Sequence, residues 1–333
     1  MRVLLALSLC GAAFAQSGPP APVRNMPPPP AVVGILNYIH AVNSLDKTLA
    51  FYRDVFGLEA KTQPFPNPGV PALTNSPGVK LQLATLHFPN AGFGLELTEF
   101  SGVERKPGQA LPTDPGAADI QIRVRDIEPV FGAIKKTGVT IITRSGAPIK
   151  IGPPDSNLRS ILVRDPDGYM VEAIQFPPDV DAPATGNVLG AAMGLTIGDM
   201  ESTLRFYKDL LGFEPTGKNE FTNDPAVVDL VGTSKDAQFR QMAANVPGTK
   251  AHMEFYEFKG IPRTRFHLRV PDPGAPAMAL QVRDLDGLLI RMAAAGVKVT
   301  SKDGAVVQFS PTVRNIFVED PNGVNIELFQ RNQ

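Results

Sequence analysis

Carboxylates are the side chains of this sequence whose spacing best suits chemistry. Glu96 lies in the run LELTEF and Glu172 in the run DPDGYMVEAIQF, and each has a counterpart further along the chain, Glu254 and Glu327. Carboxylates on neighbouring strands can hold a hard divalent cation or act as general acids and bases. The elements that would bring these four residues together therefore decide what the protein can do.

The sequence has few residues for chemistry that depends on cysteine or histidine. The 333 residues contain one cysteine and four histidines. Cys10 lies in MRVLLALSLCGAAFA (Met1–Ala15), whose basic residue, short apolar run and small residues Ala13 and Ala15 predict a signal peptide cleaved before Gln16. We expect the protein to be exported, to the periplasm or outside the cell. Cleavage would leave no cysteine, which excludes disulfides and thiolate metal ligands from the mature chain.

The amino-acid composition excludes some kinds of binding partner. The 32 basic and 33 acidic residues nearly cancel, and no basic run is present, which argues against nucleic acid and against an anionic membrane surface. Apart from the leader no stretch is long and apolar enough for membrane insertion. A proline-rich tether over 16–32 is expected to be extended. The phosphate-loop, HExxH and GxSxG motifs are absent from the sequence.

The remainder is a duplication. Three segments of the first half return in the second, at offsets of 155, 158 and 155 residues: FYRDVFGLE as FYKDLLGFE, DPGAADIQIRVRD as DPGAPAMALQVRD, and DPDGYMVEAIQF as DPNGVNIELFQ. In-register repetition of this kind indicates two copies of one unit. We place one domain at 33–177, a linker at 178–187 and a second domain at 188–331.

Each half divides again into a strand, a helix and three further strands. Leu45, Leu49, Tyr52 and Phe56 form the apolar stripe of a helix that Gly57 ends. The corresponding stripe in the second half is Met200, Leu204, Tyr207 and Leu211. A further helix in each half follows a capping aspartate, Asp126 or Asp284. Runs such as 120–124 and 306–309 are strand-like. The pattern predicts an α+β fold of four βαβββ modules that form two cup-shaped mixed sheets.

These motifs together resemble the vicinal oxygen chelate superfamily, which includes glyoxalases, bleomycin-resistance proteins and extradiol dioxygenases. The resemblance rests on the FYxDxxG helix ends, on DPDG and DPNG before a strand bearing glutamate, and on LELTEF, and it covers about 33–331. It implies a divalent metal on the floor of a cup, where the metal chelates neighbouring substrate oxygens. The family's ligands are histidines and glutamates at four strand positions.

Carried over by spacing, the family's positions hold no histidine here. The first falls on Asn37 and Ala192, the second on Glu96 and Glu254, the third on Asp119 and Ala277, and the last on Glu172 and Glu327. If each half closes its own cup, the resemblance implies a first site of Asn37, Glu96, Asp119 and Glu172. Its oxygen donors favour Mg, Mn or Ca over Fe or Zn. Glu172 and Glu96 are the candidate catalytic residues.

Two alternatives stay open at this point. If modules pair between the halves, the site becomes Asp119, Glu172, His252 and Glu254, because His252 and Glu254 are two residues apart on one strand face. Alternatively the carboxylates are solvated or paired with Arg123, Arg125 or Arg269, and no metal binds. We expect His40 to be a buried, hydrogen-bonded core residue, and His87 and His267 to lie in surface loops.

Three functions fit these observations. The first is an exported enzyme of the glyoxalase or dioxygenase type that acts on a small oxygen-rich or aromatic molecule. Such an enzyme could be a monomer or a homodimer. The second is a metal-free protein that sequesters an apolar small molecule, as bleomycin-resistance proteins do, in a pocket lined by residues such as Phe65, Phe88, Phe93, Phe221 and Tyr256. The third is an interaction protein.

Overall fold

The computed structural model describes residues 29–153, 155–178 and 182–331. The predicted signal peptide, most of the proline-rich tether and part of the linker lie outside the described residues. Within them, no helix is both long and apolar enough to cross a bilayer.

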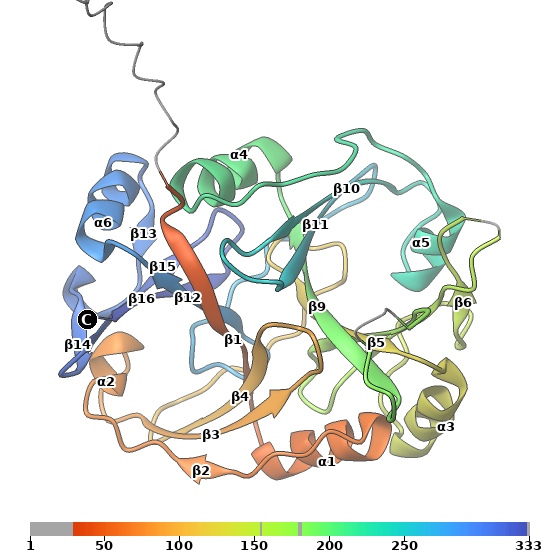
Figure 1. Cartoon of the computed structure of the whole chain (residues 1–333), viewed down its shortest axis with the longest axis horizontal. Coiled ribbons are helices and arrows are strands. Elements are labelled where there is room, and N and C mark those ends of the chain that lie inside the picture. The colour runs from red at the N-terminus through yellow and green to blue at the C-terminus, as the bar shows by residue number, and fades with distance from the viewer. Residues whose placement is uncertain (1–28, 154, 179–181, 332–333) are drawn as a thin grey trace, which may run out of the picture.

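The described chain folds into two mixed sheets, whose strands lie mostly to the left and to the right in Figure 1. Sheet A has the order β13-β15-β16-β12-β1-β4-β3-β2, with β14 paired to β15. Its strands come from the first quarter of the chain, β1 (Val32–Val42), β2 (Gln63–Pro64), β3 (Lys80–His87) and β4 (Gly94–Ser101), and from the last, β12 (Pro276–Val282), β13 (Lys298–Val299), β14 (Val307–Ser310), β15 (Val313–Glu319) and β16 (Asn325–Arg331).

Sheet B is built from the two middle quarters, in the order β10-β11-β9-β5-β8-β7-β6. Its strands are β5 (Ala118–Val124), β6 (Ile149–Lys150), β7 (Arg159–Arg164), β8 (Met170–Gln175), β9 (Val188–Ile197), β10 (Gln238–Asn245) and β11 (His252–Lys259). In both sheets the central contact is antiparallel, β1 with β12 and β5 with β9, while the flanking contacts of these strands are parallel. The predicted mixed, cup-forming sheets are therefore confirmed.

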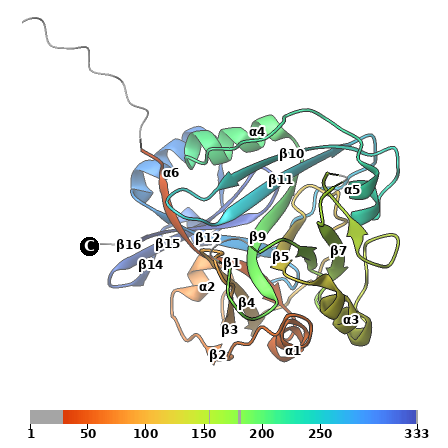
Figure 2. The ribbon, with the colours of Figure 1, turned by 45° about the vertical axis from the view of Figure 1, so that its right-hand side comes forward.

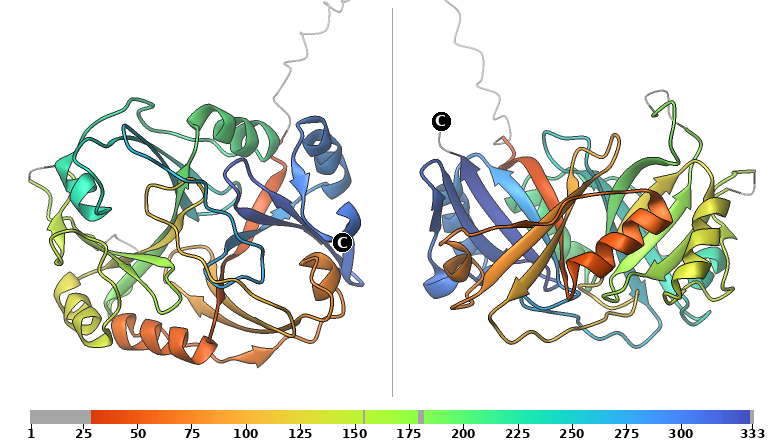
Figure 3. Two further views of the ribbon diagram at one scale, coloured as in Figure 1. Left: turned by 180° about the vertical axis from the view of Figure 1, so that it is seen from behind. Right: turned by 90° about the horizontal axis from the view of Figure 1, so that it is seen from below.

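Helices join the two modules of each half. Helix α1 (Leu45–Phe56) packs on α3 (Ile127–Thr137), and the π-helical turn η1 (Arg205–Leu210) that continues α4 (Met200–Leu204) packs on α6 (Leu285–Ala294). Figure 1 and the view from behind in Figure 3 both show these pairs on opposite sides of the molecule. Short helices α2 (Val70–Leu73) and α5 (Pro225–Leu230) and the 3₁₀ turn η2 (Lys302–Gly304) complete the described elements.

Local sequence signals explain where these helices begin and end. The side chains of Asp126 and Asp284 accept hydrogen bonds from backbone N–H groups of the first turn, as N-caps do. Gly57 closes α1 with a φ of 69°, a left-handed conformation that glycine adopts without strain. The helix expected around Tyr207 differs in its second part, where the backbone widens into the π turn and Leu211 N–H bonds to the carbonyl of Phe206.

The core separates into three clusters. The largest lies between the sheets and their helices and includes the stripe residues Tyr52 and Tyr207, both fully buried. The two smaller clusters lie in the cups, one on sheet A around Phe100 and Phe317 and one on sheet B around Leu162 and Met170. The turned view in Figure 2 shows α4 and α6 above the strands and α1 and α3 below them. Each sheet thus has one face covered by helices and an open face that can receive a ligand.

Candidate functional site

Each sheet carries a cavity on its open face. The sheet A cup encloses about 350 Å³ and the sheet B cup about 340 Å³, sizes typical of small-molecule sites. Most of the lining in both is apolar. Carboxylates from the positions that the repeats predicted stand on both floors, Glu96 and Glu327 in the sheet A cup and Asp119, Glu172 and Glu254 in the sheet B cup.

The sheet B floor is a network around Glu254. Tyr256 donates a short hydrogen bond from its hydroxyl to Glu254, and the Gln121 amide lies 3.2 Å from Glu254 Oε2 and 3.4 Å from the Tyr256 hydroxyl. His252 Nε2 lies 3.5 Å from Glu254 Oε1. Across the sheet, Ser160 donates a short hydrogen bond to Glu172 Oε1. Glu254 is therefore surrounded by donors, whereas Glu172 has one.

This difference gives the three acids different pKa values. Burial raises the pKa of Asp119 to about 7 and that of Glu172 to about 8, and their repulsion with each other and with Glu254 adds to the effect. Burial also acts on Glu254, but the hydrogen bonds from His252, Tyr256 and Gln121 outweigh it, so that its pKa lies below the usual value. Near neutral pH the floor holds one ionised carboxylate beside two that carry or exchange protons.

A glycine makes room for Asp119 on this floor. Asp119 faces Gly194 across the β5–β9 pairing, and a Cβ atom at Gly194 would lie 1.9 Å from Asp119 Oδ1. Gly94 plays the same part in the other cup, where a Cβ would lie 2.8 Å from Asn37 Oδ1. Both floors therefore depend on a close backbone approach that only glycine permits.

In the sheet A cup each carboxyl has an amide partner. Asn37 Nδ2 donates to Glu96 Oε2 at 2.8 Å, and Asn315 Nδ2 donates a short hydrogen bond to Glu327 Oε1. Burial raises the pKa of Glu327 to about 7, with a further contribution from the charge of Glu96, whose own pKa burial also raises. The floor of this cup thus has two acids and two amides, whereas the sheet B floor has three acids and one amide, that of Gln121.

The set Asn37, Glu96, Asp119 and Glu172, expected if each half closed its own cup, is not brought together. Asn37 and Glu96 lie in sheet A, and Asp119 and Glu172 lie in sheet B. The reason is that β1 pairs with β12 and β5 with β9, so that each cup combines one module from each half. Asp119, Glu172 and Glu254 do share a cup, and His252 contacts Glu254 from beside it.

The arginines expected to neutralise these acids are engaged elsewhere. Arg123 lies over the Phe176 ring, Arg125 donates to the carbonyl oxygens of Pro183 and Gly186, and Arg269 pairs with Asp272. Among the residues that the structure describes, no lysine or arginine forms an ion pair with Asp119, Glu172 or Glu254. The prediction that arginines pair with the floor carboxylates is wrong, and His252 beside Glu254 is the one basic side chain in contact with these acids among the described residues.

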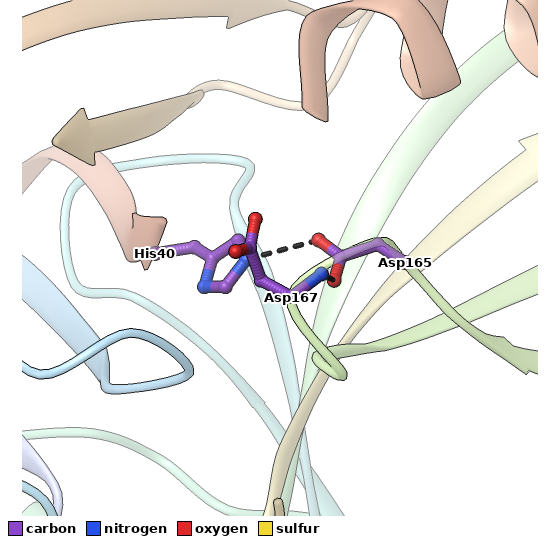
Figure 4. Close-up of side chains that lie close together, drawn as sticks. All are labelled: His40, Asp165 and Asp167. Atoms are coloured by element: carbon purple, nitrogen blue, oxygen red, sulfur yellow. Dashed lines mark hydrogen bonds and ion pairs between the residues drawn. The ribbon is translucent and has the colours of Figure 1, made fainter. Parts of the chain in front are cut away.

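His40 behaves as expected of a core histidine. It is fully buried, and its Nε2 lies 2.9 Å from Asp165 Oδ2 (Figure 4). Its ring stacks on Tyr169. His87 is exposed at the end of β3, and His267 is partly exposed beside Gly323. None of these three histidines lies on a cup floor.

His40, Asp165 and Asp167 form a compact group (Figure 4). Among the described residues, it is the only group of three or more histidine, cysteine or acidic side chains whose possible metal-ligand atoms all lie within 4.8 Å of one another. The oxygens are already bonded. Asp165 Oδ1 accepts from two backbone N–H groups, and Asp167 accepts from Asn43 N and from the Thr48 hydroxyl. This group therefore lacks the free ligand oxygens that a cation would need.

Comparison with the second half shows that this group holds the DPDG turn in place. There Asn322 takes the place of Asp167 and accepts from Gly198 N, while its amide reaches the Thr203 hydroxyl. Asp320, the counterpart of Asp165, accepts from the Tyr207 hydroxyl where Asp165 is bonded to His40. The shared pattern holds the turn against the first strand and helix of the neighbouring module.

Several floor residues carry no family motif and were missed from sequence. Ser160 and Asn315, which orient Glu172 and Glu327, are 155 residues apart, so the repeat offset could have identified them as a pair. Gln121 offers no such signal, because its counterpart in the duplicated segment is an alanine, Ala279. Tyr256 was expected only as an apolar lining residue, whereas its hydroxyl is a main partner of Glu254.

Comparison with known proteins agrees with this geometry. The model of the glyoxalase/bleomycin resistance protein/dioxygenase superfamily matches the chain twice, over 34–173 and 189–328. A lactoylglutathione lyase of Oryza sativa is 27% identical over 200 residues, which are 60% of each chain. A probable lactoylglutathione lyase of Vibrio cholerae is 32% identical over 144 residues, 42% of this chain and 89% of that one. The chain thus spans about 60% of the length of the rice relative.

Solved structures show the same fold. Glyoxalase I from Zea mays superposes with a TM-score of 0.56 at 20% identity, over 89% of this chain and 92% of the other. A putative dioxygenase from Bacillus subtilis gives a TM-score of 0.55 at 14% identity, over 91% and 87%. At these identities the likeness concerns the fold and leaves the reaction open.

Proposed function

Because the chain belongs to the glyoxalase/bleomycin resistance protein/dioxygenase superfamily, we propose that it is a lyase or isomerase that moves a proton on a small, uncharged, oxygen-bearing molecule bound in the sheet B cup. The observation that supports this proposal is a set of three acids in an apolar cup, with Glu172 buried and Asp119 and Glu254 partly buried, none of which has a lysine or arginine partner among the described residues. The sheet A cup, with two acids that each have an amide partner, is less suited to the reaction.

Glu172 is the proposed proton carrier. General acids and bases work best when their pKa lies near the operating pH, and its pKa of about 8 meets that condition. Ser160 holds Oε1, which leaves the second oxygen for the substrate. Asp119 can take part in the same transfer because its pKa is about 7. Hydrogen bonds from His252, Tyr256 and Gln121 lower the pKa of Glu254, so that one negative charge stays on the floor.

The donor set also suits a hard divalent cation. Asp119, Glu172 and Glu254 would hold it, with oxygen ligands of the kind that Mg, Mn and Ca prefer. Their oxygens do not all lie within 4.8 Å of one another in this structure, so the three side chains would have to close around the ion. Such a cation would polarise a carbonyl or hydroxyl oxygen of the substrate and so acidify the neighbouring C–H group. The single imidazole nearby, His252, already contacts Glu254 and Asn245.

The lining of the sheet B cup favours an uncharged substrate. Its described residues include four acids, Asp119, Glu172, Asp224 and Glu254, and neither lysine nor arginine. Lactoylglutathione, the compound in the name of the rice relative, carries carboxylates that would find no positive partner inside. We therefore expect small hydroxycarbonyl compounds to be turned over faster than lactoylglutathione, as measured by proton exchange at carbon in D₂O.

Cation binding gives the direct test. After treatment with a chelator, Mg or Mn at millimolar concentration is expected to raise the melting temperature of the wild type by several degrees, because a ligand that binds only the folded state stabilises it. Glu172→Gln should abolish the rise. Glu96→Gln, the matched change in the sheet A cup, should preserve it.

A rise that persists in Glu172→Gln, or one that Glu96→Gln removes, would place the cation outside the sheet B cup. If no cation changes the wild-type melting temperature and Glu172→Gln leaves proton exchange intact, the proposed function is refuted. Exchange that depends on Glu172 without any cation would show that the carboxyl groups suffice, and the proposed proton transfer would stand.

Export is also proposed, on the leader of Met1–Ala15. Expressed in a bacterial host, the protein is expected to be recovered outside the cytoplasm with Gln16 as its first residue. N-terminal sequencing or intact mass measures this directly. A chain that keeps Met1 and stays in the cytoplasm would contradict it.

A further inference from the structure

The sheet A cup has a different chemistry from the cup used in the proposed function. Its walls carry five phenylalanines, and two of their rings, those of Phe65 and Phe309, stack with centroids 5.9 Å apart. The phenylalanines that line it are Phe65, Phe100, Phe309, Phe317 and Phe329. A cavity of about 350 Å³ with such walls fits one aromatic or branched apolar group.

The floor of this cup offers acceptors. Asn315 is 4% exposed, and its Nδ2 group is used by Glu327. Its Oδ1 atom is buried and has no hydrogen-bond partner among the described residues. Glu96 and Glu327 add carboxyl oxygens beside it. A buried acceptor without a donor is energetically unfavourable, so the floor is incomplete until something that donates hydrogen bonds occupies it.

The charge of the floor also lacks compensation. In the described part of the chain neither Glu96 nor Glu327 forms an ion pair, and the charge of Glu96 helps to raise the pKa of Glu327. Arg331 is the one basic residue of the lining. It is exposed and lies over the Phe329 ring, 5.7 Å from the centroid, where water screens its charge.

We propose that the sheet A cup binds a primary ammonium compound with an aromatic or branched apolar body, held at its nitrogen by Glu96, Glu327 and Asn315 Oδ1. An ammonium group has three donors, which match these three acceptors in number. Its single positive charge would compensate the charge of a floor whose two carboxyl groups form no ion pair with the described residues. The aromatic walls favour a cation as well, since ring faces attract positive charge.

A divalent metal fits this floor less well than the sheet B floor. The sheet B floor has three acids against two here. The two cups therefore differ in the charge that they can neutralise, one positive charge in sheet A and two in sheet B.

The test uses the full chain with 2-phenylethylamine as the probe and 2-phenylethanol as its uncharged counterpart, each titrated by calorimetry at pH 7.5. The amine is expected to bind at least ten times more tightly than the alcohol. Glu327→Gln and Glu96→Gln, which conserve shape and remove charge, should each weaken amine binding at least tenfold. Glu172→Gln, the matched change in sheet B, should leave it unchanged.

Equal binding of amine and alcohol, or no binding of the amine at millimolar concentration, would overturn the proposal. Loss of binding in Glu172→Gln, or displacement of the amine by equimolar Mg, would place the amine in the sheet B cup and overturn it as well. Melting curves of the variants show that each is folded. Because the cation titration responds to Glu172 and the amine titration to Glu327, either proposal can fail while the other stands.

Discussion

Replacing Glu172 by glutamine is expected to raise the melting temperature of the metal-free protein by about 5–10 °C at pH 9 and to change it little at pH 5. Glu172 is 7% exposed, and its pKa lies at about 8 in the folded protein against 4.5 for the unperturbed group. Between these two pH values the folded state binds the proton more tightly than the unfolded state does. Stability therefore falls as the pH rises from about 4.5 to about 8.

The size of the effect follows from the displacement of the pKa. One pKa unit corresponds to about 1.4 kcal/mol, so the wild type should lose roughly 3–5 kcal/mol across this range through Glu172. Glutamine carries no charge and can still accept the hydrogen bond from Ser160. The variant should thus lack this part of the pH dependence.

Thermal melts of both proteins at pH 5, 7 and 9 measure the difference. Glu220→Gln, at an exposed residue, should melt like the wild type at every pH. Adding Mg or Mn at pH 9 should reduce the difference in melting temperature between Glu172→Gln and the wild type, because the cation stabilises the wild type. A gap of equal size at pH 5 and pH 9 would contradict the burial of an ionisable Glu172.

Replacing His40 by leucine is expected to destabilise the protein by about 3 kcal/mol, because it leaves Asp165 Oδ2 buried without its partner. The side chains of both residues are fully buried, and the contact joins β1 to the turn before β8. The second half tolerates Leu195 at the corresponding position because the Tyr207 hydroxyl donates to Asp320 instead.

The corresponding tyrosine of the first half provides a matched control. The hydroxyl of Tyr52 is buried and has no partner in the described chain. Tyr52→Phe should therefore be nearly neutral in the wild type, whereas Tyr207→Phe should cost about 1–2 kcal/mol. In the His40→Leu background Tyr52→Phe should become costly, because the hydroxyl can then turn to Asp165.

Urea unfolding of the single and double variants measures the coupling between His40 and Tyr52. The expected signature is a double variant that is less stable than the sum of the single changes. Additive effects, or a His40→Leu protein as stable as the wild type, would show that the pair is not what holds the turn.

Much of the fold was predictable because its signals are local. The apolar stripe that includes Tyr52 and Phe56, the aspartate caps Asp126 and Asp284, and the glycine at position 57 depend on residues within one helix. The buried state of His40 also followed from strand alternation. The positions of Glu96, Glu172, Glu254 and Glu327 followed from the duplication and the family resemblance.

What the sequence determined by itself is thus the four-module α+β fold, its family and the positions of the acids along the strands. Only the tertiary structure decided which acids meet, because the strands β1, β5, β9 and β12 have similar patterns and each could pair with another at its free edge. It also decided their protonation. A pKa depends on burial and on neighbours such as Tyr256 and Gln121, which reach Glu254 from different strands and are brought together only when sheet B forms.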